Sequence, residues 1–488
     1  MNMMTKTTFR LYRSGALGTL TLCVAGLAAL GGTANRPNIL IITTDQQQVD
    51  ALSAVGNPWV KTPHMDSIAA GGVCFTKSYC AFPLCSPSRA ALHTGRTPHE
   101  IRVDRNTVPI DPAIPISGQL FRAAGYDTGY AGKWHLPNTY PLEGIEGYEV
   151  LNKTTRLGKL AHDVDEVTMN AAIEFLKRKR DKPFLLVASF INPHDICLPA
   201  GGDSPLLADL WKKYEPQPGA NIPPLPTNFG LPDGGVADTR NRISDKWDEN
   251  QWRRYRYAYY RMVEDVDQQV GRVLAALRET GQEDNTLIVF TSDHGEGLGS
   301  HRWTGKMMFY EEEAAVPLII SWKGVTPAAR IDRDHLVSTL DVLPTICDYA
   351  GVQPPPLMRG ESLRQVIEKP NQPGHEFVVS EMAGGGAPRA GRSFMVRTKQ
   401  YKYMFLPNTD VKEMLFDMQS DPGEMKNLAG QKNLASVLEH HRQLLAKWKQ
   451  LTDEAKYPLQ SADQTKQPKK KKGTSNRPSP KRGAAPAT

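Results

Sequence analysis

Four short apolar runs, each followed at once by polar side chains, constrain the fold of this chain more than any other feature. Short runs rich in β-branched residues are typical of buried strands, and helical patterns such as 165–178 and 255–279 lie between them. The runs with their polar ends are 38–46 (NILIITTDQ), 126–135 (YDTGYAGKWH), 183–195 (PFLLVASFINPHD) and 285–295 (NTLIVFTSDHG). This alternation predicts an α/β sheet, in which functional side chains collect at the carboxyl ends of the strands.

The two ends of the chain differ in composition from its body. Residues 1–34 combine basic residues with an apolar stretch and end in small residues, which is typical of a signal peptide cleaved near Ala34. An uncleaved membrane anchor is the alternative. Residues 456–488 are basic and predict a disordered tail. Between these ends we expect a main domain over 36–375 and a small α+β subdomain over 376–455, where hairpin-like strands precede an amphipathic helix.

Positive charge is concentrated at the same two ends. The net charge is +7, but eight Lys and Arg lie within 466–488 and three precede residue 35, so the body is slightly acidic. This distribution argues against nucleic-acid binding, and the mature protein is expected to be exported without stable membrane insertion. Six cysteines are present, and loss of Cys23 with the signal peptide leaves five. At least one thiol is then unpaired or modified, although Cys74 and Cys80 are a potential pair.

Cys85 stands directly before Ser-Pro-Ser-Arg, a segment with the features of a helix start. Ser86 is a good N-cap, Pro87 suits the first helical position, and Gly95 predicts the end of the helix. A helix N-terminus favours an anion, such as a thiolate, an oxyanion or a bound sulfate or phosphate. Arg89 is near enough to reach over the same turn. A structural cysteine before an ordinary helix is the alternative.

Two of the predicted strand ends offer metal ligands. Asp45 and Gln46 follow the first run, and Asp293 and His294 follow the last. Carboxylate and amide oxygens suit Ca²⁺ or Mg²⁺, while imidazole is compatible with several metals. The alternative for the Ser-Asp-His-Gly segment is a polar turn after a strand.

Cations and proton donors lie near the other strand ends and shortly after the metal candidates. The candidates are Lys133, His135, His194 and Lys306, with Glu296 and His301 ranked below them. Trp134, between the first two, argues for a half-buried position there. A single lysine or histidine is more often a surface or capping group, so the set, and not any one member, predicts a site.

Five motifs in order resemble those of the type I sulfatases of the alkaline phosphatase superfamily. The motifs are CSPSRAALHTGR (85–96), GYDTGYAGKWHL (125–136), NPH (192–194), TSDHGEGLGSH (291–301) and LFDMQSDPGEMKNL (415–428). The resemblance extends from about Asn38 to Leu428. It implies a large mixed, mostly parallel sheet flanked by helices, alkaline-phosphatase-like, with a smaller C-terminal α+β subdomain. The main domain would then be the catalytic domain of a sulfuric ester hydrolase.

The resemblance also implies a role for Cys85. In this family the cysteine of Cys-x-Pro-x-Arg is oxidised to Cα-formylglycine by a formylglycine-generating enzyme, which makes Cys85 the unpaired thiol. The aldehyde hydrates to a gem-diol, one hydroxyl attacks sulfur with help from a divalent cation, and the other helps to expel sulfate. The implied cation ligands are Asp45, Gln46, Asp293, His294 and residue 85 itself.

The remaining candidates receive roles from the same resemblance. Arg89 and Lys133 would steady the hydrate, and Lys133 with Lys306 would bind sulfate oxygens. His135 would help to deprotonate the gem-diol. His194 would protonate the leaving oxygen or assist the group that does so.

Two positions depart from the commonest family pattern. Gln46 stands where a second aspartate is frequent, and His294 stands where an asparagine is frequent. Both resemble variants of bacterial members, and both change the charge or the hardness of the ligand set. Ca²⁺ is the expected cation, with Mg²⁺ as the alternative.

Two other functions stay open beside the sulfatase reading. One is a phosphodiesterase or phosphonate monoester hydrolase of the same superfamily, and the other is a non-catalytic polysaccharide-binding homologue. Retention of the whole candidate set argues against the second. The expected substrate is a sulfated carbohydrate, such as a glycosaminoglycan or an algal polysaccharide. The candidate specificity parts are segments 98–107, 199–236 and 384–392, with Arg102, Arg105, Arg389 and Arg392 as partners for sulfates or carboxylates.

Overall fold

The computed structural model describes residues 36–137, 144–152, 158–202, 204–237, 243–383 and 391–457. The chain divides into Met1–Asn35, which holds none of these residues, and Arg36–Thr488. The predicted signal peptide (1–34) and nearly all of the predicted tail (456–488) therefore lie outside the described residues. The boundary expected near residue 376 stays a prediction.

A mixed, mostly parallel sheet forms the centre of the unit Arg36–Thr488, as expected. Within the described residues it has eight strands. Five neighbouring strands, β5, β4, β6, β1 and β7, are parallel, and β8 runs antiparallel to both its neighbours, β7 and β2. The spatial order is β5 (Glu149–Val150), β4 (Asp127–Gly132), β6 (Phe184–Pro193), β1 (Asn38–Asp45), β7 (Thr286–Ser292), β8 (Leu318–Ser321), β2 (Gly72–Phe75) and β9 (Arg330–Asp332). The predicted fold class is confirmed.

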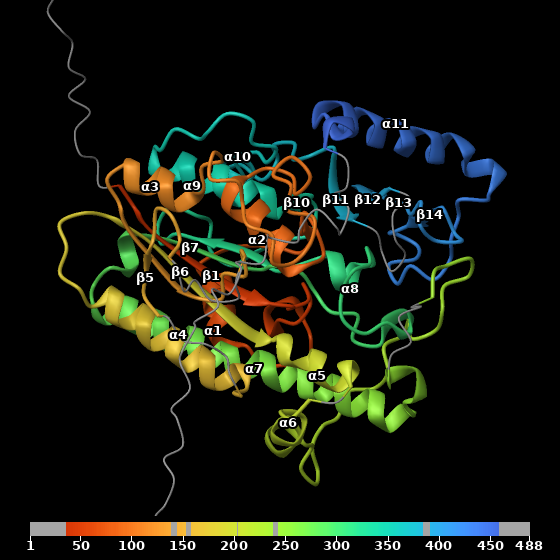
Figure 1. Ribbon diagram of the computed structural model, residues 1–488, viewed down its shortest axis with the longest axis horizontal. Coiled ribbons are helices and arrows are strands. Elements are labelled where there is room, and N and C mark those ends of the chain that lie inside the picture. Colours follow the sequence, from red (N-terminus) through yellow and green to blue (C-terminus); the bar gives the residue numbers. More distant parts are fainter. Residues whose placement is uncertain are drawn as a thin grey trace, which may run out of the picture. The chain divides into compact units, whose positions relative to one another are not determined.

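The central strands are buried on both faces because helices cover both sides of the sheet (Figure 1). Ile39 and Ile41 of β1 face one apolar layer, while Leu40 and Ile42 face the other, as the two-residue period of a strand requires. The helices of the first layer are α2 (Cys85–Thr94), α3 (Ser117–Ala123), α9 (Val342–Ala350) and α10 (Arg364–Glu368). Those of the second are α1 (Pro63–Ala70), α4 (Ala161–Leu176) and α7 (Glu249–Glu279).

A second sheet follows near the C-terminus. It is antiparallel, in the order β11 (Phe377–Ala383), β12 (Arg392–Thr398), β13 (Tyr401–Phe405) and β14 (Glu413–Asp417). One face of this sheet packs against α11 (Ala435–Leu451) through Leu438, Leu444 and Leu445. The other face contributes methionines and Phe416 to a cluster with Tyr79, Phe82 and Tyr310. The predicted strands and amphipathic helix of this region are confirmed.

Short elements complete the described chain. The strands β3 (Ser78–Tyr79) and β10 (Val337–Ser338) pair with each other, and the remaining short helices are α5 (Cys197–Gly201), α6 (Leu207–Tyr214) and α8 (Glu311–Ala314). The 3-10 turns are η1 (Ser53–Val55), η2 (His194–Ile196), η3 (Ile243–Lys246), η4 (Glu283–Asn285), η5 (Ser300–Arg302), η6 (Thr339–Asp341), η7 (Lys432–Leu434) and η8 (Glu454–Lys456). None of the helices in the described ranges combines the length and apolar character that crossing a bilayer needs.

The segment 199–236 is more ordered than its composition predicts. It contains α6, whose Leu210 and Tyr214 are buried against α7 in a cluster with Trp252 and Tyr255. The few apolar residues of this helix recur at helical spacing between the prolines and glycines, which allows it to pack against α7.

Parallel pairing brings the polar strand ends together at one edge. Asp45 of β1 is in register with Pro193 of β6, and Thr44 pairs with Ser292 of β7. On the other side of β6, Gly132 of β4 pairs with Ser189. All four predicted runs thus end at the same edge of the sheet, where loops of distant sequence meet.

Candidate active site

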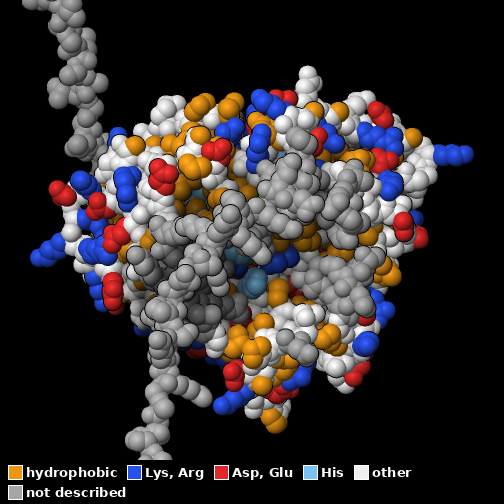
Figure 2. Space-filling model, in the orientation of Figure 1, with side chains coloured by type: hydrophobic (Ala, Val, Ile, Leu, Met, Phe, Trp, Pro, Cys, Tyr) orange, Lys and Arg blue, Asp and Glu red, His pale blue; other side chains and the backbone are white. Residues whose placement is uncertain are grey.

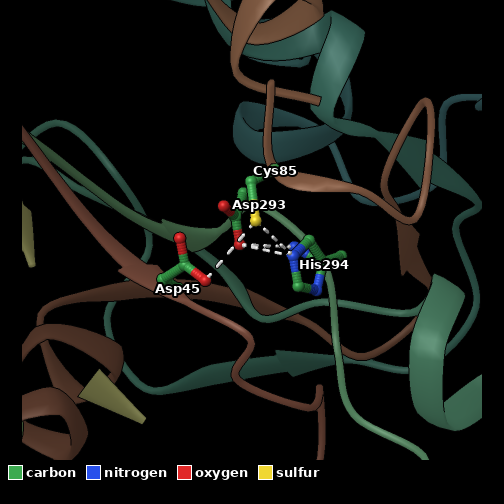
Figure 3. A group of neighbouring side chains, drawn as sticks. All are labelled: Asp45, Cys85, Asp293 and His294. Atoms are coloured by element: carbon green, nitrogen blue, oxygen red, sulfur yellow. Dashed lines mark hydrogen bonds and ion pairs between the residues drawn. The ribbon is translucent and has the colours of Figure 1, made fainter. Parts of the chain in front are cut away.

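Four potential ligands for a metal ion converge at this edge. Ligand atoms of Asp45, Cys85, Asp293 and His294 all lie within 4.8 Å of one another, and all four side chains are buried. Figure 3 shows the four side chains pointing toward a common centre. Cys85 Sγ lies 3.3 Å from His294 Nε2 and 3.8 Å from Asp45 Oδ1. These are the predicted cation ligands other than Gln46, assembled from β1, α2 and the loop after β7.

Cys85 is the first residue of α2, so the helix begins two residues earlier than the expected start at Pro87. Ser88 N donates to Leu84 O at 3.0 Å, so Leu84, in extended conformation, is the N-cap. Ser86 therefore does not cap the helix, and its hydroxyl instead donates to the carbonyl oxygen of His135 at 2.6 Å. The helix ends at Gly95 in the left-handed conformation, as predicted. Cys85 still lies at a buried helix N-terminus, where negative charge is stabilised.

Arg89 holds two carboxylates of the site. Its Nη2 lies 2.9 Å from Asp45 Oδ2, and its Nε lies 2.9 Å from Asp293 Oδ2. Nη1 donates to Lys133 O at 3.0 Å and to Ser189 Oγ at 2.7 Å. Burial acts to raise the pKa of Asp45, but its cationic neighbours, led by Lys133, hold that pKa well below its usual value. Burial and the charge of Asp45 together raise the pKa of Asp293.

Two lysines face the cysteine. Lys306 Nζ lies 3.1 Å from Cys85 Sγ, and Lys133 Nζ lies 3.8 Å from the same atom and 2.5 Å from Asp45 Oδ2. Burial and Asp45 act to raise the pKa of the Cys85 thiol, but Lys133 and Lys306 outweigh them and hold it well below its ordinary value. The position of residue 85 is therefore one at which an anion is strongly favoured.

The amide of Gln46 also belongs to the site. Its Oε1 accepts from Lys306 Nζ at 2.9 Å, so Gln46 and Cys85 contact the same ammonium group. Its Nε2 donates to a carboxylate oxygen of Glu296, and Cys197 Sγ lies beside both ends of the amide. The backbone N–H of Gln46 donates to Asp293 Oδ1 at 3.1 Å.

The donor set fits a divalent cation. His294 Nδ1 lies 2.9 Å from the carbonyl oxygen of Gly295, which can only accept, so Nδ1 carries a proton and Nε2 is the nitrogen that faces Cys85 and is available to a metal ion. Carboxylates of Asp45 and Asp293 and the amide oxygen of Gln46 are hard donors of the kind that Ca²⁺ and Mg²⁺ prefer.

The two remaining histidines are placed differently. His194 Nε2 lies 3.8 Å from Asp45 Oδ1, and its side chain is 23% exposed, against 4% or less for Asp45, Arg89 and Lys133. Burial, with Lys133 and Lys306, lowers the pKa of His194 to about 3. Figure 2 shows histidine beside Lys or Arg side chains in a hollow near the middle of the view. Among the described residues, the hydrogen bonds of His135 run to Ser86 through its carbonyl and do not include Cys85.

The predicted specificity arginines have divergent environments. Arg392 is 3% exposed and pairs with Glu454 at 2.6 Å, so its guanidinium serves the fold and the prediction that it meets substrate was wrong. Arg105 pairs with Asp104 at 2.8 Å. Arg102 is exposed, and its guanidinium carbon lies 5.9 Å from the centre of the Tyr457 ring. Arg389 and nearly all of the segment 384–392 lie outside the described residues.

Three contributors were missed or ranked low in the sequence. Glu296, two residues after His294, is completely buried and bonds Gln46. Ser189, inside the strand β6, accepts from Arg89, and Cys197 contacts Gln46. Position after a strand end was a signal for Glu296, whereas no local pattern marks a serine within a strand. The five described cysteines, including the potential pair Cys74 and Cys80, are free thiols.

Comparisons with known proteins agree with this geometry. The chain matches the sequence profile of the sulfatase family over residues 37–352 and that of the N-sulphoglucosamine sulphohydrolase C-terminal region over 299–451. It is 34% identical over 446 residues to a Δ4,5-hexuronate-2-O-sulfatase of Bacteroides thetaiotaomicron, covering 86% of this chain and 91% of the relative.

Solved structures give the same result. A 2-O GAG (glycosaminoglycan) sulfatase superimposes with a TM-score of 0.74 at 31% identity, covering 86% of this chain and 93% of the other. A phosphonate monoester hydrolase of Agrobacterium radiobacter superimposes with a TM-score of 0.70 at 26% identity, covering 86% and 96%. The chain therefore belongs to the sulfatase family of the alkaline phosphatase superfamily and is a sulfuric ester hydrolase.

Proposed function

We propose that this protein is an exported sulfatase that hydrolyses sulfate esters of carbohydrate through a nucleophile derived from Cys85. The observation that carries the proposal is the environment of the Cys85 thiol. It lies at a buried helix N-terminus, faces Lys133 and Lys306, and contacts a cluster of potential cation ligands. A structural cysteine needs none of these neighbours, whereas a group that carries and transfers an anionic sulfuryl group needs all of them.

The nucleophile would be the hydrate of a Cα-formylglycine at position 85. Conversion of the thiol is an oxidation, so it requires a formylglycine-generating enzyme and an electron acceptor in the host. The hydrate supplies an oxygen nucleophile and, when the aldehyde re-forms, a route for releasing sulfate. Arg89, which donates to both Asp45 and Asp293, keeps the surrounding carboxylates in place.

The cation would be Ca²⁺, with Mg²⁺ as the alternative. Asp45, Gln46, Asp293 and His294 would hold it together with residue 85. A divalent cation in this position supplies Lewis-acid polarisation of the oxygens that it touches. The two carboxylates would balance its charge, so Arg89 and Lys133 would leave the site net positive for an anionic sulfate ester.

Substrate handling would fall to the lysines and the histidines. Lys133 and Lys306 would bind the sulfate oxygens, because both ammonium groups face position 85. A bound sulfate would offset the positive charge that these lysines impose on His194. The partly exposed His194 imidazole would meet the leaving oxygen and deliver its proton as the sulfur–oxygen bond breaks. His135 would help to deprotonate the hydrate.

The proposed substrate class is sulfated carbohydrate. It is supported by the relatives named above, a hexuronate-2-O-sulfatase and a 2-O GAG sulfatase. Export is supported by the signal-peptide pattern of residues 1–34. N-terminal sequencing of the mature protein checks export with cleavage: a start near residue 35 supports it, and an intact Met1 contradicts cleavage and favours the uncleaved anchor.

The decisive experiment joins a mass measurement to an ester panel. The peptide that contains Cys85, taken from protein purified from its own host, should be lighter than the cysteine form by about 18 Da. The same protein should hydrolyse sulfated saccharides faster than phosphate diesters and phosphonate monoesters. Cys85→Ala should abolish turnover, while Cys347→Ala, which removes a buried thiol elsewhere, should not. An unmodified thiol, or a preference for phosphonate esters, would overturn the proposal; the second result would favour the activity of the Agrobacterium protein.

A further inference from the structure

We propose that Glu296 is a positioning residue for the active site: it fixes the amide of Gln46 so that its oxygen faces Lys306 and would be available to the proposed cation. The inference rests on the proposed function, because it concerns how a ligand of the proposed cation is held. In this role Glu296 acts on the site through its hydrogen bond to Gln46, and not as a ligand beside Asp45, Cys85, Asp293 and His294.

Glu296 is placed to act only as an acceptor. It is completely buried in the loop after β7. Its Oε1 accepts from Tyr255 Oη at 2.8 Å, from Leu298 N at 3.2 Å and from Gly305 N at 2.5 Å. Its Oε2 accepts from Gln46 Nε2. A buried carboxylate with hydrogen-bond donors on both oxygens is held in one orientation.

The amide of Gln46 has two ends of similar shape and opposite chemistry. Lys306 can only donate, so it selects Oε1, and the Glu296 carboxylate selects Nε2. The flipped amide would set its N–H groups against an ammonium and its oxygen against a carboxylate, and both contacts would be repulsive. Cys197 Sγ lies beside both ends of the amide and does not discriminate between them. Glu296 and Lys306 together therefore decide which atom is offered as a ligand.

The need to select one orientation of the amide arises because residue 46 is a glutamine. An aspartate there would offer oxygen at both ends of its carboxylate and would need no such selection. A glutamine brings the correct ligand atom only in one of two orientations, and an incorrectly oriented amide removes one ligand and adds repulsion. Glu296 thus compensates for the departure of Asp45-Gln46 from the commoner pair of aspartates.

The same carboxylate also anchors the lysine that completes the arrangement. Gly305, whose N–H bonds Glu296 Oε1, directly precedes Lys306, and Gly297 N donates to Gly305 O at 2.8 Å. Glu296 therefore sets both partners of the Lys306–Gln46 contact. Loss of its charge is expected to loosen the cation ligand and the sulfate-binding ammonium together.

The test exchanges the amide of Gln46 and the carboxylate of Glu296. The quantity measured is the Ca²⁺ affinity of the folded proteins, by isothermal titration calorimetry. Glu296→Gln should weaken Ca²⁺ binding by about 10-fold or more. The double variant Gln46→Glu/Glu296→Gln exchanges carboxylate and amide without changing the net charge, and it should recover affinity to within about 3-fold of the wild type. Tyr255→Phe, which removes one donor to Glu296 and leaves Gln46 untouched, is the matched control and should bind Ca²⁺ normally.

The outcomes separate this inference from the proposed function. A wild type that binds neither Ca²⁺ nor Mg²⁺ would overturn the proposed cation. Normal affinity of Glu296→Gln, beside a wild type that binds Ca²⁺, would overturn the positioning role alone. If Glu296→Gln does not fold, the double variant decides: recovered folding and affinity support the role. A double variant that stays unfolded or more than about 10-fold weaker shows Glu296 to be merely structural.

Discussion

The guanidinium of Arg89 lies 2.9 Å from the carboxylate of Asp45, and neither side chain is more than 2% exposed. The same guanidinium lies 2.9 Å from Asp293 Oδ2. Two buried carboxylates this close to one another are costly without a positive partner, because the protein interior screens charge poorly. Arg89 therefore stabilises the folded site in addition to any part that it takes in catalysis.

Arg89→Ala should consequently lower the free energy of unfolding by about 3 to 5 kcal/mol in the presence of a chelator. Added Ca²⁺ should restore part of this loss, since a bound cation would replace the missing positive charge. Urea unfolding with and without Ca²⁺ measures both effects. Arg272→Ala is the control, because its exposed guanidinium lies 3.8 Å from Glu166 and should contribute within about 0.5 kcal/mol. Equal losses for the two variants would contradict the structural role.

Removal of divalent cations should lower both activity and melting temperature, and Ca²⁺ should restore both. The carboxylates of Asp45 and Asp293 repel each other when no cation lies between them. Activity assays and thermal unfolding before and after dialysis against chelator give the measurement. Asp293→Asn should abolish the Ca²⁺-dependent shift in melting temperature, whereas Asp284→Asn, at an exposed surface pair with Lys323, should retain it. A chelator that changes neither quantity would count against the cation site.

His194→Ala should impair esters with poor leaving groups far more than activated aryl sulfates. An alkoxide of a sugar needs a proton as the ester bond breaks, whereas a nitrophenolate does not. The ratio of kcat/KM for a saccharide sulfate and for a nitrophenyl sulfate, in wild type and variant, measures the effect. We expect the ratio to fall by about 100-fold or more. Equal losses on both substrates would remove the leaving-group role.

Gly132→Ala should unfold or strongly destabilise the protein. Gly132 has a φ of 98°, and a Cβ there would meet the carbonyl oxygen of Ser189 at 1.9 Å, the atom that accepts from Lys133 N. We expect a loss above about 3 kcal/mol, measured by urea unfolding.

Gly125→Ala is the matched control for that glycine. Gly125 has a φ of 90° with nothing within 4 Å of the added carbon, so only backbone strain should remain. The loss should be about 1 to 2 kcal/mol, and activity should persist. Similar losses of stability for both variants would show that the close approach of β6 is not what excludes a side chain at residue 132.

Stability should fall as the pH rises toward alkaline values because of His375. Its Nε2 lies 2.9 Å from Asp341 Oδ2, and that carboxylate raises the pKa of His375 to about 9 although burial opposes it. The folded pKa exceeds the unfolded one, so this stabilisation is complete below about pH 6.5 and disappears as the pH passes 9.

The matching variant is His375→Gln. At pH 6 it should be less stable than the wild type by at most roughly 3 kcal/mol, and the difference should shrink to near zero above pH 9.5. Urea unfolding at several pH values measures the difference, with His440→Gln, at an exposed position on α11, as control. A difference that is independent of pH would contradict the charged pair.

Much of the fold could be read from local patterns. The runs at 38–46, 126–135, 183–195 and 285–295 became β1, β4, β6 and β7 because β-branched and apolar residues of that length are stable only when buried on both faces. Once these strands are parallel, their polar ends must meet at one edge. The convergence of Asp45, Lys133, His194 and Asp293 could therefore be predicted without coordinates.

Other features depended on contacts between distant segments. The helix α2 begins at Cys85 and not at Pro87, and the hydroxyl of Ser86, the predicted N-cap, bonds the carbonyl of His135. Arg392 is buried against Glu454, a partner from beyond α11. No spacing rule within a short window announces either contact, because each depends on how separate elements pack.

The sequence by itself determined the strands, the order of the motifs and the residue types that reach the site. Only the tertiary structure decided which atoms face one another. Arg89 pairs with both Asp45 and Asp293, and Glu296 accepts a hydrogen bond from Gln46. The physical reason is range. Periodicity and helix starts are set by interactions over a few residues, whereas the partner of a buried polar group is set by the sheet order that brings segments 204 to 250 residues apart into hydrogen-bond distance.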